Sequence, residues 1–187
     1  MAKLADWITS TYLDRLNVEE MRAEFAKGKQ LLLPNFIRKD VFPSVLREAN
    51  TAKFKRAYLP DQMSCGFSMK QDALLRFLSS KEFRAYITLI TGIPSGNRAF
   101  YTEFKAGDYT ILKDIPQSFK LITHYFISPW NEAWGGRMIF REKDGSHHYV
   151  HPDSNTLLIT LNQKRLRGYV EYVNHHIGKK KLVAANV

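Results

Sequence analysis

The sequence predicts an α+β fold, in which a helical first half covers one sheet of a β double sheet formed by the second half. Up to Gly92, apolar residues mostly recur at three- and four-residue spacing, as in amphipathic helices. After Gly92, short alternating or apolar runs follow at the spacing of about ten residues that is typical of a sandwich or barrel. No repeat or clear linker interrupts the chain. Residues 1–187 are therefore predicted as a single domain, with a helical N-terminal layer over about 1–92 and a β-barrel core over about 93–187.

The first half is expected to contain several helices and two short strands. Asn17 is a candidate N-cap for the second helix, Gly28 is its expected end, and Asp40 is placed to cap the third. Ser79 and Ser80 mark the expected junction of two further short helices. The predicted helices span 6–16, 18–28, 38–52 and, as that pair, 70–93, and the predicted strands span 29–37 and 53–59.

The second half contains roughly eight candidate strands. Turn-forming stretches separate them, among them Ala106-Gly107-Asp108 and Asp144-Gly145-Ser146. The candidate strands span 98–104, 109–113, 120–127, 136–142, 147–151, 155–161, 168–174 and 180–186.

Composition limits the class of protein and its setting. One cysteine, Cys65, excludes an intramolecular disulfide and a Cys-rich zinc site, so we expect a reducing, cytoplasmic location. No run approaches the roughly 20 apolar residues of a membrane span, and the N-terminal stretch lacks the apolar core of a signal peptide. We therefore expect a soluble, intracellular protein without a membrane partner.

The chain is basic, with 28 Lys and Arg against 18 Asp and Glu and a formal net charge of +10. Such a charge makes contact with polyanions plausible, and a nucleic-acid partner is a candidate for the basic C-terminal hairpin. The sequence shows no stacking or groove-reading motif beside these charges, so a solvated basic face is an equal alternative. The densest basic residues are Lys164, Arg165, Arg167, Lys179, Lys180 and Lys181.

Five segments resemble, in order, the prolyl-hydroxylase-like branch of the iron(II)- and 2-oxoglutarate-dependent oxygenases. The resemblance covers about residues 80–187 and implies a double-stranded β-helix, the jelly-roll or cupin-like barrel, with a helical layer before it. The segments are "SSKEFRAYITLITGIPSG", "GDYTILKDI", "HYFISPWNEAWGGRMIF", "VHPDSNTLLIT" and "GYVEYVNHHIGKKKLVAANV". If the protein is active, the resemblance implies hydroxylation of a protein side chain with iron(II) and 2-oxoglutarate.

The positions that match the iron ligands of this family hold other residues. The family binds iron through two His and one carboxylate, which leaves three metal positions for 2-oxoglutarate and oxygen. The first two ligands form a His-x-Asp pair, and the matching residues here are Lys113 and Ile115. The position of the distal histidine is held by Gly168. A shift of one residue would use Asp114 as the carboxylate but places Leu112, which has no donor atom, at the histidine position. The resemblance therefore predicts neither metal ligands nor catalytic residues.

The pocket for 2-oxoglutarate also departs from the family. An Arg or Lys on the last strand pairs with the distal carboxylate in the family, and a hydroxyl residue commonly assists two positions later. The matching residues are Lys180, which can bind a carboxylate only as a point charge, and Leu182, which has no hydroxyl. Lys180 as one more member of a basic hairpin is the alternative.

Three functions remain open from the sequence. The first is a catalytically degenerate, cofactor-free oxygenase-like module that binds a protein partner or a small carboxylate. The second is an active 2-oxoglutarate-dependent hydroxylase with an atypical metal site, which requires two histidines to converge with a carboxylate such as Asp114 or Asp153. The third is a nucleic-acid-associated basic protein. The histidines available to the second are His124, His147, His148, His151, His175 and His176.

Overall fold

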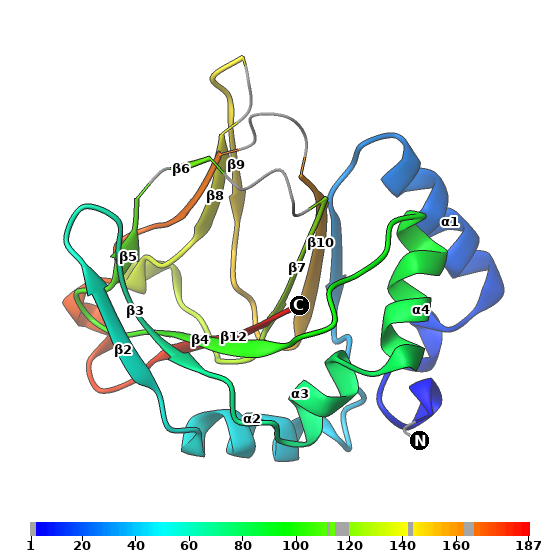
Figure 1. Ribbon diagram of the computed structural model, residues 1–187, viewed down its shortest axis with the longest axis horizontal. Coiled ribbons are helices and arrows are strands. Elements are labelled where there is room, and N and C mark those ends of the chain that lie inside the picture. Colours follow the sequence, from blue (N-terminus) through cyan, green and yellow to red (C-terminus); the bar gives the residue numbers. More distant parts are fainter. Residues whose placement is uncertain (1–2, 112, 115–119, 142–143, 163–166) are drawn as a thin grey trace.

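The computed structural model describes residues 3–111, 113–114, 120–141, 144–162 and 167–187, with 113–114 described by their backbone. A curved β-barrel occupies one side of the molecule and α-helices lie along its outer surface (Figure 1). The helices are α1 (Arg15–Ala26), α2 (Phe42–Thr51), α3 (Ala73–Leu78) and α4 (Lys81–Thr91), and short 3-10 turns are η1 (Leu4–Asp6), η2 (Ser10–Tyr12), η3 (Glu132–Trp134) and η4 (His175–Ile177).

The larger sheet forms one wall of the barrel. Its strands pair antiparallel in the order β1-β10-β7-β12-β4-β3-β2, and β5 adds to β3 beside this path. Their bounds are β1 (Leu31–Pro34), β2 (Lys55–Leu59), β3 (Met63–Ser68), β4 (Phe100–Phe104), β5 (Tyr109–Thr110), β7 (Leu121–Phe126), β10 (Thr156–Leu161) and β12 (Leu182–Asn186).

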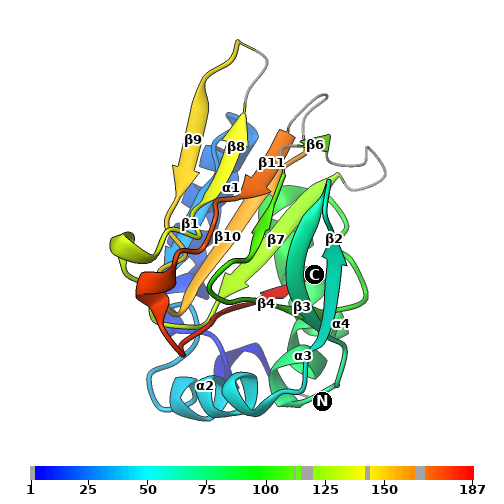
Figure 2. The ribbon, with the colours of Figure 1, turned by 90° about the vertical axis from the view of Figure 1, so that its left-hand side faces the viewer.

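A smaller sheet closes the opposite wall. Its antiparallel order is β6-β11-β8-β9, with β6 (Lys113–Asp114), β8 (Met138–Arg141), β9 (His147–Val150) and β11 (Arg167–Val170). Figure 2, turned by 90°, shows this sheet facing the larger one, with the helices behind and below. The predicted double sheet with a helical layer is confirmed.

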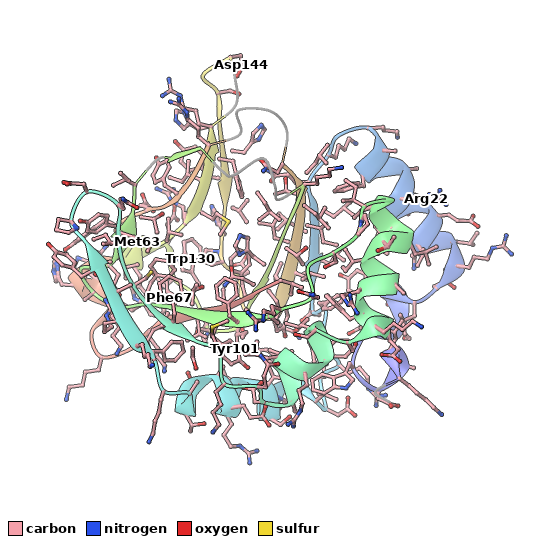
Figure 3. All side chains as sticks on the ribbon, viewed as in Figure 1. Arg22, Met63, Phe67, Tyr101, Trp130 and Asp144 are labelled. Carbon is pink, nitrogen blue, oxygen red and sulfur yellow. The ribbon has the colours of Figure 1, made fainter. Side chains whose placement is uncertain are left out.

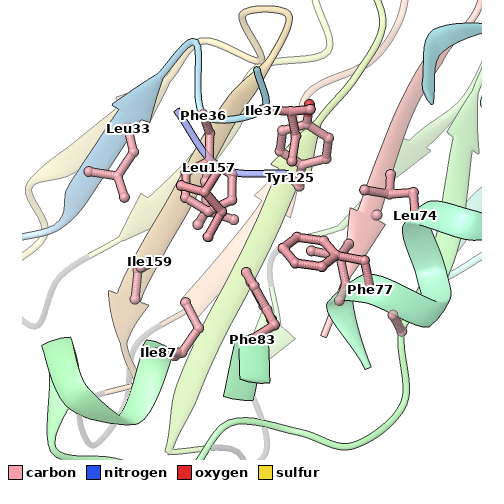
Figure 4. Close-up of a cluster of buried hydrophobic side chains, with 14 of the residues drawn as sticks. Leu33, Phe36, Ile37, Leu74, Phe77, Phe83, Ile87, Tyr125, Leu157 and Ile159 are labelled. Atoms are coloured by element: carbon pink, nitrogen blue, oxygen red, sulfur yellow. The ribbon is translucent and has the colours of Figure 1, made fainter. Parts of the chain in front are cut away.

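Each face of the larger sheet has its own role, because successive side chains of a strand point to opposite sides. On β7, Thr123 and Tyr125 face the helices, whereas His124 and Phe126 face the barrel interior. Figure 4 shows the helix-facing core, where side chains of β7 and β10 pack against α3, α4 and the segment after β1. The fully buried residues there include Phe36, Leu74, Phe77, Phe83, Ile87, Tyr125, Leu157 and Ile159.

Two capping predictions in the first half are wrong. The N-cap of α1 is Asp14, whose carboxylate accepts from the backbone N–H groups of Leu16 and Asn17 at 3.0 and 3.3 Å. Asp40 pairs instead with the guanidinium of Arg38, so α2 begins without a side-chain cap. The expected helix over 6–16 consists of η1 and η2 followed by the start of α1.

The junction at Ser79-Ser80 is confirmed, because α3 ends at Leu78 and α4 begins at Lys81 with Ser80 as its N-cap. The eight strand segments of the second half all contain strands, although 109–113 divides between β5 and β6. β3 was not predicted, because its run "MSCGFS" has no clean alternation. Since β1, β2 and β3 precede residue 92 and join the larger sheet, strands as well as helices come from the N-terminal part.

Two glycines let the chain turn from η3 into β8. Gly135 has φ +68° and Gly136 has φ +77°, a backbone region that favours glycine. A Cβ on Gly135 would lie 2.3 Å from the carbonyl oxygen of Tyr172, and one on Gly136 would lie 2.4 Å from Leu182 Cδ1.

Among the described residues, no helix is both long and apolar enough to cross a membrane.

Candidate binding cavity

The barrel encloses a cavity in two joined chambers. The inner chamber has a volume of about 200 Å³ and the outer one about 780 Å³. Both are lined by Thr110, His124, Met138, Val170 and Asn186, which therefore mark the junction between them. An interior of this size, lined mainly by apolar groups with a few polar ones, is typical of a site for a small ligand.

The inner chamber lies toward the end of the barrel where Leu182 pairs with Phe104 in the strand register. Figure 3 shows Met63, Phe67 and Trp130 on the barrel side of the molecule, with Tyr101 toward the helices. The lining side chains are mostly apolar and include Met63, Cys65, Phe67, Phe104, Phe126 and Leu182. Burial raises the pKa of the Cys65 thiol to about 11, so this group is uncharged at neutral pH.

A chain of hydrogen bonds crosses the interior face of the larger sheet. His124 and Asn186 are register partners on β7 and β12, and His124 Nδ1 bonds to Asn186 Oδ1. The Asn186 amide nitrogen donates to Thr102 Oγ1 at 3.1 Å and to the Phe100 carbonyl at 3.5 Å. Because a carbonyl can only accept, this contact sets the amide orientation, and Nδ1 of the imidazole is then the donor to Asn186 Oδ1.

His124 is consequently a neutral side chain inside the barrel. Burial lowers its pKa to about 4, and the hydrogen bond that the ring donates to Asn186 opposes this shift only in part. Its Nδ1–H is held by Asn186, so the ring orientation and tautomer are both defined by the sheet. The cavity therefore contains a polar group without a formal charge at neutral pH.

The structure brings two of the three predicted iron-ligand positions together. Gly168 of β11 is the register partner of Lys113 of β6, and Gly168 also lines the outer chamber. Ile115 lies outside the described residues, and so do the side chains of Lys113 and Asp114. This pairing does not test the assignment of Lys113 or Gly168 as an iron-ligand equivalent, so both assignments stay predictions, as does that of Ile115.

The donor set of the described residues does not fit iron(II). Within those residues, no group of three His, Cys, Asp or Glu side chains lies close enough to hold a metal ion. Of those four residue types, the described lining includes Cys65, whose thiolate is disfavoured, and His124, whose Nδ1 bonds to Asn186.

The other histidines lie elsewhere. The ring centroids of His175 and His176 lie 4.2 Å apart on η4 in a tilted arrangement, and the ring centroid of His151 lies 4.7 Å from that of Trp130. His147 and His148 stand on β9, the edge strand of the smaller sheet. The convergent histidine site that an atypical oxygenase requires is therefore not formed by the described residues.

The two predicted 2-oxoglutarate positions separate in space. Leu182 lines the inner chamber, where it adds apolar surface. Lys180 is absent from the described lining, and its Nζ lies 4.8 Å from the ring centroid of Trp134 in a cation–π contact. This contact accounts for Lys180 without a carboxylate ligand, although no observation tests its assignment as the 2-oxoglutarate equivalent.

Buried charges lie on the opposite face of the same strands. Glu103 of β4 is buried and contacts Lys105 Nζ and Lys181 Nζ, each at 3.1 Å. Asp108 accepts from Ser64 Oγ at 2.6 Å and from the Arg56 guanidinium. These pairs hold β2, β3, β4 and the start of β12 together, and they are structural rather than part of the cavity.

Comparison with solved structures places the fold. A prolyl-4-hydroxylase from Pseudomonas putida superposes with a TM-score of 0.68 at 12% identity, covering 90% of this chain and 96% of that one. A Trichoplax adhaerens prolyl hydroxylase, solved with a hypoxia-inducible-factor peptide, gives 0.71 at 14%, covering 90% and 86%. A 2-oxoglutarate–iron(II) oxygenase-family oxidoreductase from Burkholderia pseudomallei gives 0.69 at 10%, covering 90% and 88%.

The chain has the fold of the 2-oxoglutarate–iron(II) oxygenases. No protein-family model matches its sequence, and a search of curated proteins finds no match. At 10–14% identity these superpositions establish the double-stranded β-helix alone. The fold does not determine an activity, which depends on the residues that line the cavity.

Proposed function

We propose that this protein is a non-catalytic, oxygenase-like binding module that takes a small molecule into the barrel interior without iron. The observation that carries the proposal is the character of the cavity, which is mostly apolar and offers two uncharged metal-donor side chains, Cys65 and His124, among its described residues. An apolar cavity of this size stabilises a bound apolar molecule by removing its surface from water.

The cavity suits an apolar small molecule better than 2-oxoglutarate, which is small and doubly charged. A carboxylate in the inner chamber would lose its hydration, and the described lining there offers no cation to compensate. A protein partner, a nucleic-acid partner at the basic hairpin and the cytoplasmic location stay predictions. Two of the three lysines of that hairpin, Lys180 and Lys181, already contact Trp134 and Glu103.

The first experiment measures metal and cosubstrate binding. The purified protein is dialysed anaerobically against iron(II), with and without 2-oxoglutarate, and bound iron and thermal unfolding are measured. We expect less than stoichiometric iron and no shift with 2-oxoglutarate. Stoichiometric iron with a 2-oxoglutarate-dependent shift would instead establish the active oxygenase. A variant carrying Lys113→His, Ile115→Asp and Gly168→His is the matched positive control for a metal site in this frame.

The second experiment measures ligand entry with an uncharged fluorescent probe, N-phenyl-1-naphthylamine. We expect saturable binding with enhanced fluorescence. Ala184 lines the inner chamber, so Ala184→Phe fills space there and should weaken binding at least tenfold. Ala26→Phe, the same change at the exposed end of α1, should leave binding unchanged. Equal binding by the two variants would show that the probe lies outside the barrel.

A further inference from the structure

The described lining of the cavity has charge at one end. Neither chamber includes an Asp or Glu among its described residues, whereas the outer chamber includes the cations Arg98 and Lys120. Both residues are exposed, and neither forms an ion pair with another described residue. Two cations at the opening of an apolar cavity are therefore available to a ligand.

The strand register places these two cations at the same end of the barrel. Lys120 directly precedes β7, and Arg98 lies two residues before the start of β4. β12 lies between these two strands and pairs antiparallel with each of them, so β7 and β4 begin at the same end of the sheet. The neighbouring ends of the three strands are therefore at one edge, marked by Asn186 and its register partner Phe100. The opposite, inner end is marked by Leu182.

The length of the inner chamber along β12 follows from the same register, because Leu182 and Asn186 both line that chamber. From Leu182 to Asn186 the strand rises four residues, or about 13 Å at the spacing of an antiparallel strand. With carbon–carbon bonds of about 1.5 Å, an extended chain of about ten carbons has a comparable length. An apolar body of that length spans the inner chamber, and a head group at its outer end then lies in the outer chamber, which Arg98 and Lys120 line.

The polar groups along this path are largely satisfied by one another. His124 Nδ1, Asn186 and Thr102 form the interior hydrogen-bond chain, and the Thr102 hydroxyl lies 3.4 Å from the Ala184 carbonyl. None of these groups carries a charge that could hold an ionic head inside the barrel. A charged head is thus favoured at the opening and an apolar body inside.

We propose that the natural ligand is an amphipathic monoanion, with its acidic head between Arg98 and Lys120 and its apolar body in the inner chamber. The inference rests on the proposed binding function and specifies its ligand class. A chain with a cationic head is disfavoured by the two cations, and a dianion of the size of 2-oxoglutarate has too little apolar surface to fill the interior.

Three ligands of equal chain length test the charge preference: decanoate, decanol and decyltrimethylammonium, each below its micellar concentration. Each is titrated against bound N-phenyl-1-naphthylamine at pH 7.5 and low salt. We expect decanoate to displace the probe at a concentration about tenfold below that of decanol, with the ammonium compound weakest. Because the cations are exposed, 0.5 M NaCl should reduce the advantage of decanoate over decanol.

The double variant Arg98→Gln and Lys120→Gln supplies the matched control. Both side chains are exposed, so the fold is expected to persist, as circular dichroism can verify. The variant should lose the preference for decanoate while decanol binds as before. A double substitution of the exposed cations Arg15 and Arg22 on α1, far from the cavity, should retain the preference.

The outcomes separate the two proposals. If the uncharged probe does not bind, or binds equally to Ala184→Phe, the proposed function fails and the ligand class fails with it. If the probe binds in the barrel but decanol equals decanoate, or if the double variant keeps the preference, the binding function stands and the monoanion proposal is overturned.

Discussion

The turn after η3 allows a test of how steric overlap constrains the backbone there. Its glycine, Gly135, has a counterpart in Gly178, which has a similar backbone conformation but different surroundings. Gly135 follows η3 with φ +68° and ψ −150°, and Gly178 follows η4 with φ +61° and ψ −128°. A Cβ on Gly135 would lie 2.3 Å from the carbonyl oxygen of Tyr172, whereas a Cβ on Gly178 would meet nothing within 4 Å. The pair separates backbone strain from steric overlap.

The expected magnitudes differ accordingly. Both Gly135→Ala and Gly178→Ala force a non-glycine residue into a sparsely populated backbone region, at a cost of about 1–3 kcal/mol each. Gly135→Ala must also displace a backbone carbonyl in the bridge between Gly135 and Val173, which adds an overpacking cost of about 2 kcal/mol. For a chain of this length the extra cost corresponds to a further fall in Tm of about 4–8 °C.

The assay is urea unfolding of wild type and both variants, followed by circular dichroism and tryptophan fluorescence, with Tm measured in parallel. Agreement of the two probes establishes that a single free energy of unfolding describes each variant. If Gly135→Ala and Gly178→Ala lose the same stability, the close approach of Tyr172 does not constrain this turn and the explanation from steric overlap is refuted.

Three further predictions concern buried groups. The folded-state pKa of His124 is about 4 against an ordinary 6.5, so its contribution to stability is fully present above pH 6.5 and lost as pH falls to 4. The loss is at most about 3 kcal/mol, because the ring lines the cavity and is partly accessible from it. Between pH 6.5 and 4, the free energy of unfolding from urea denaturation should therefore fall less steeply with pH for His124→Phe than for the wild type. Asp108→Asn should cost about 2 kcal/mol in urea unfolding by weakening three contacts, whereas the exposed control Asp40→Asn should leave the free energy of unfolding nearly unchanged. The raised pKa of Cys65 should slow iodoacetamide alkylation of the folded protein about 100-fold through its lower thiolate fraction, and equal rates for folded and urea-unfolded protein would contradict its burial.

The order of the elements was predictable from local patterns. Alternation identified β10 and β12, because each presents apolar side chains to the helix-facing core on every second residue, and β7 departs from this pattern on the same face at Thr123. The junction at Ser79-Ser80 followed from capping chemistry that acts within a few residues. The run "MSCGFS" of β3 was missed because its small residues Ser64, Gly66 and Ser68 carry no strand signal of their own.

Residue types and their spacing along the chain were enough to predict the fold class, which is confirmed. The same information predicts non-ligand residues at the positions that match the iron ligands, and this assignment stays a prediction. The pairing of polar groups depends on strand register: His124 and Asn186 are 62 residues apart in the chain and become partners because β7 and β12 align there. Tertiary structure also decided that Lys180 contacts Trp134, and that Arg98 and Lys120 share one end of the barrel. Periodicity assigns a side chain to a face of its strand, whereas its neighbour on that face depends on how distant strands align.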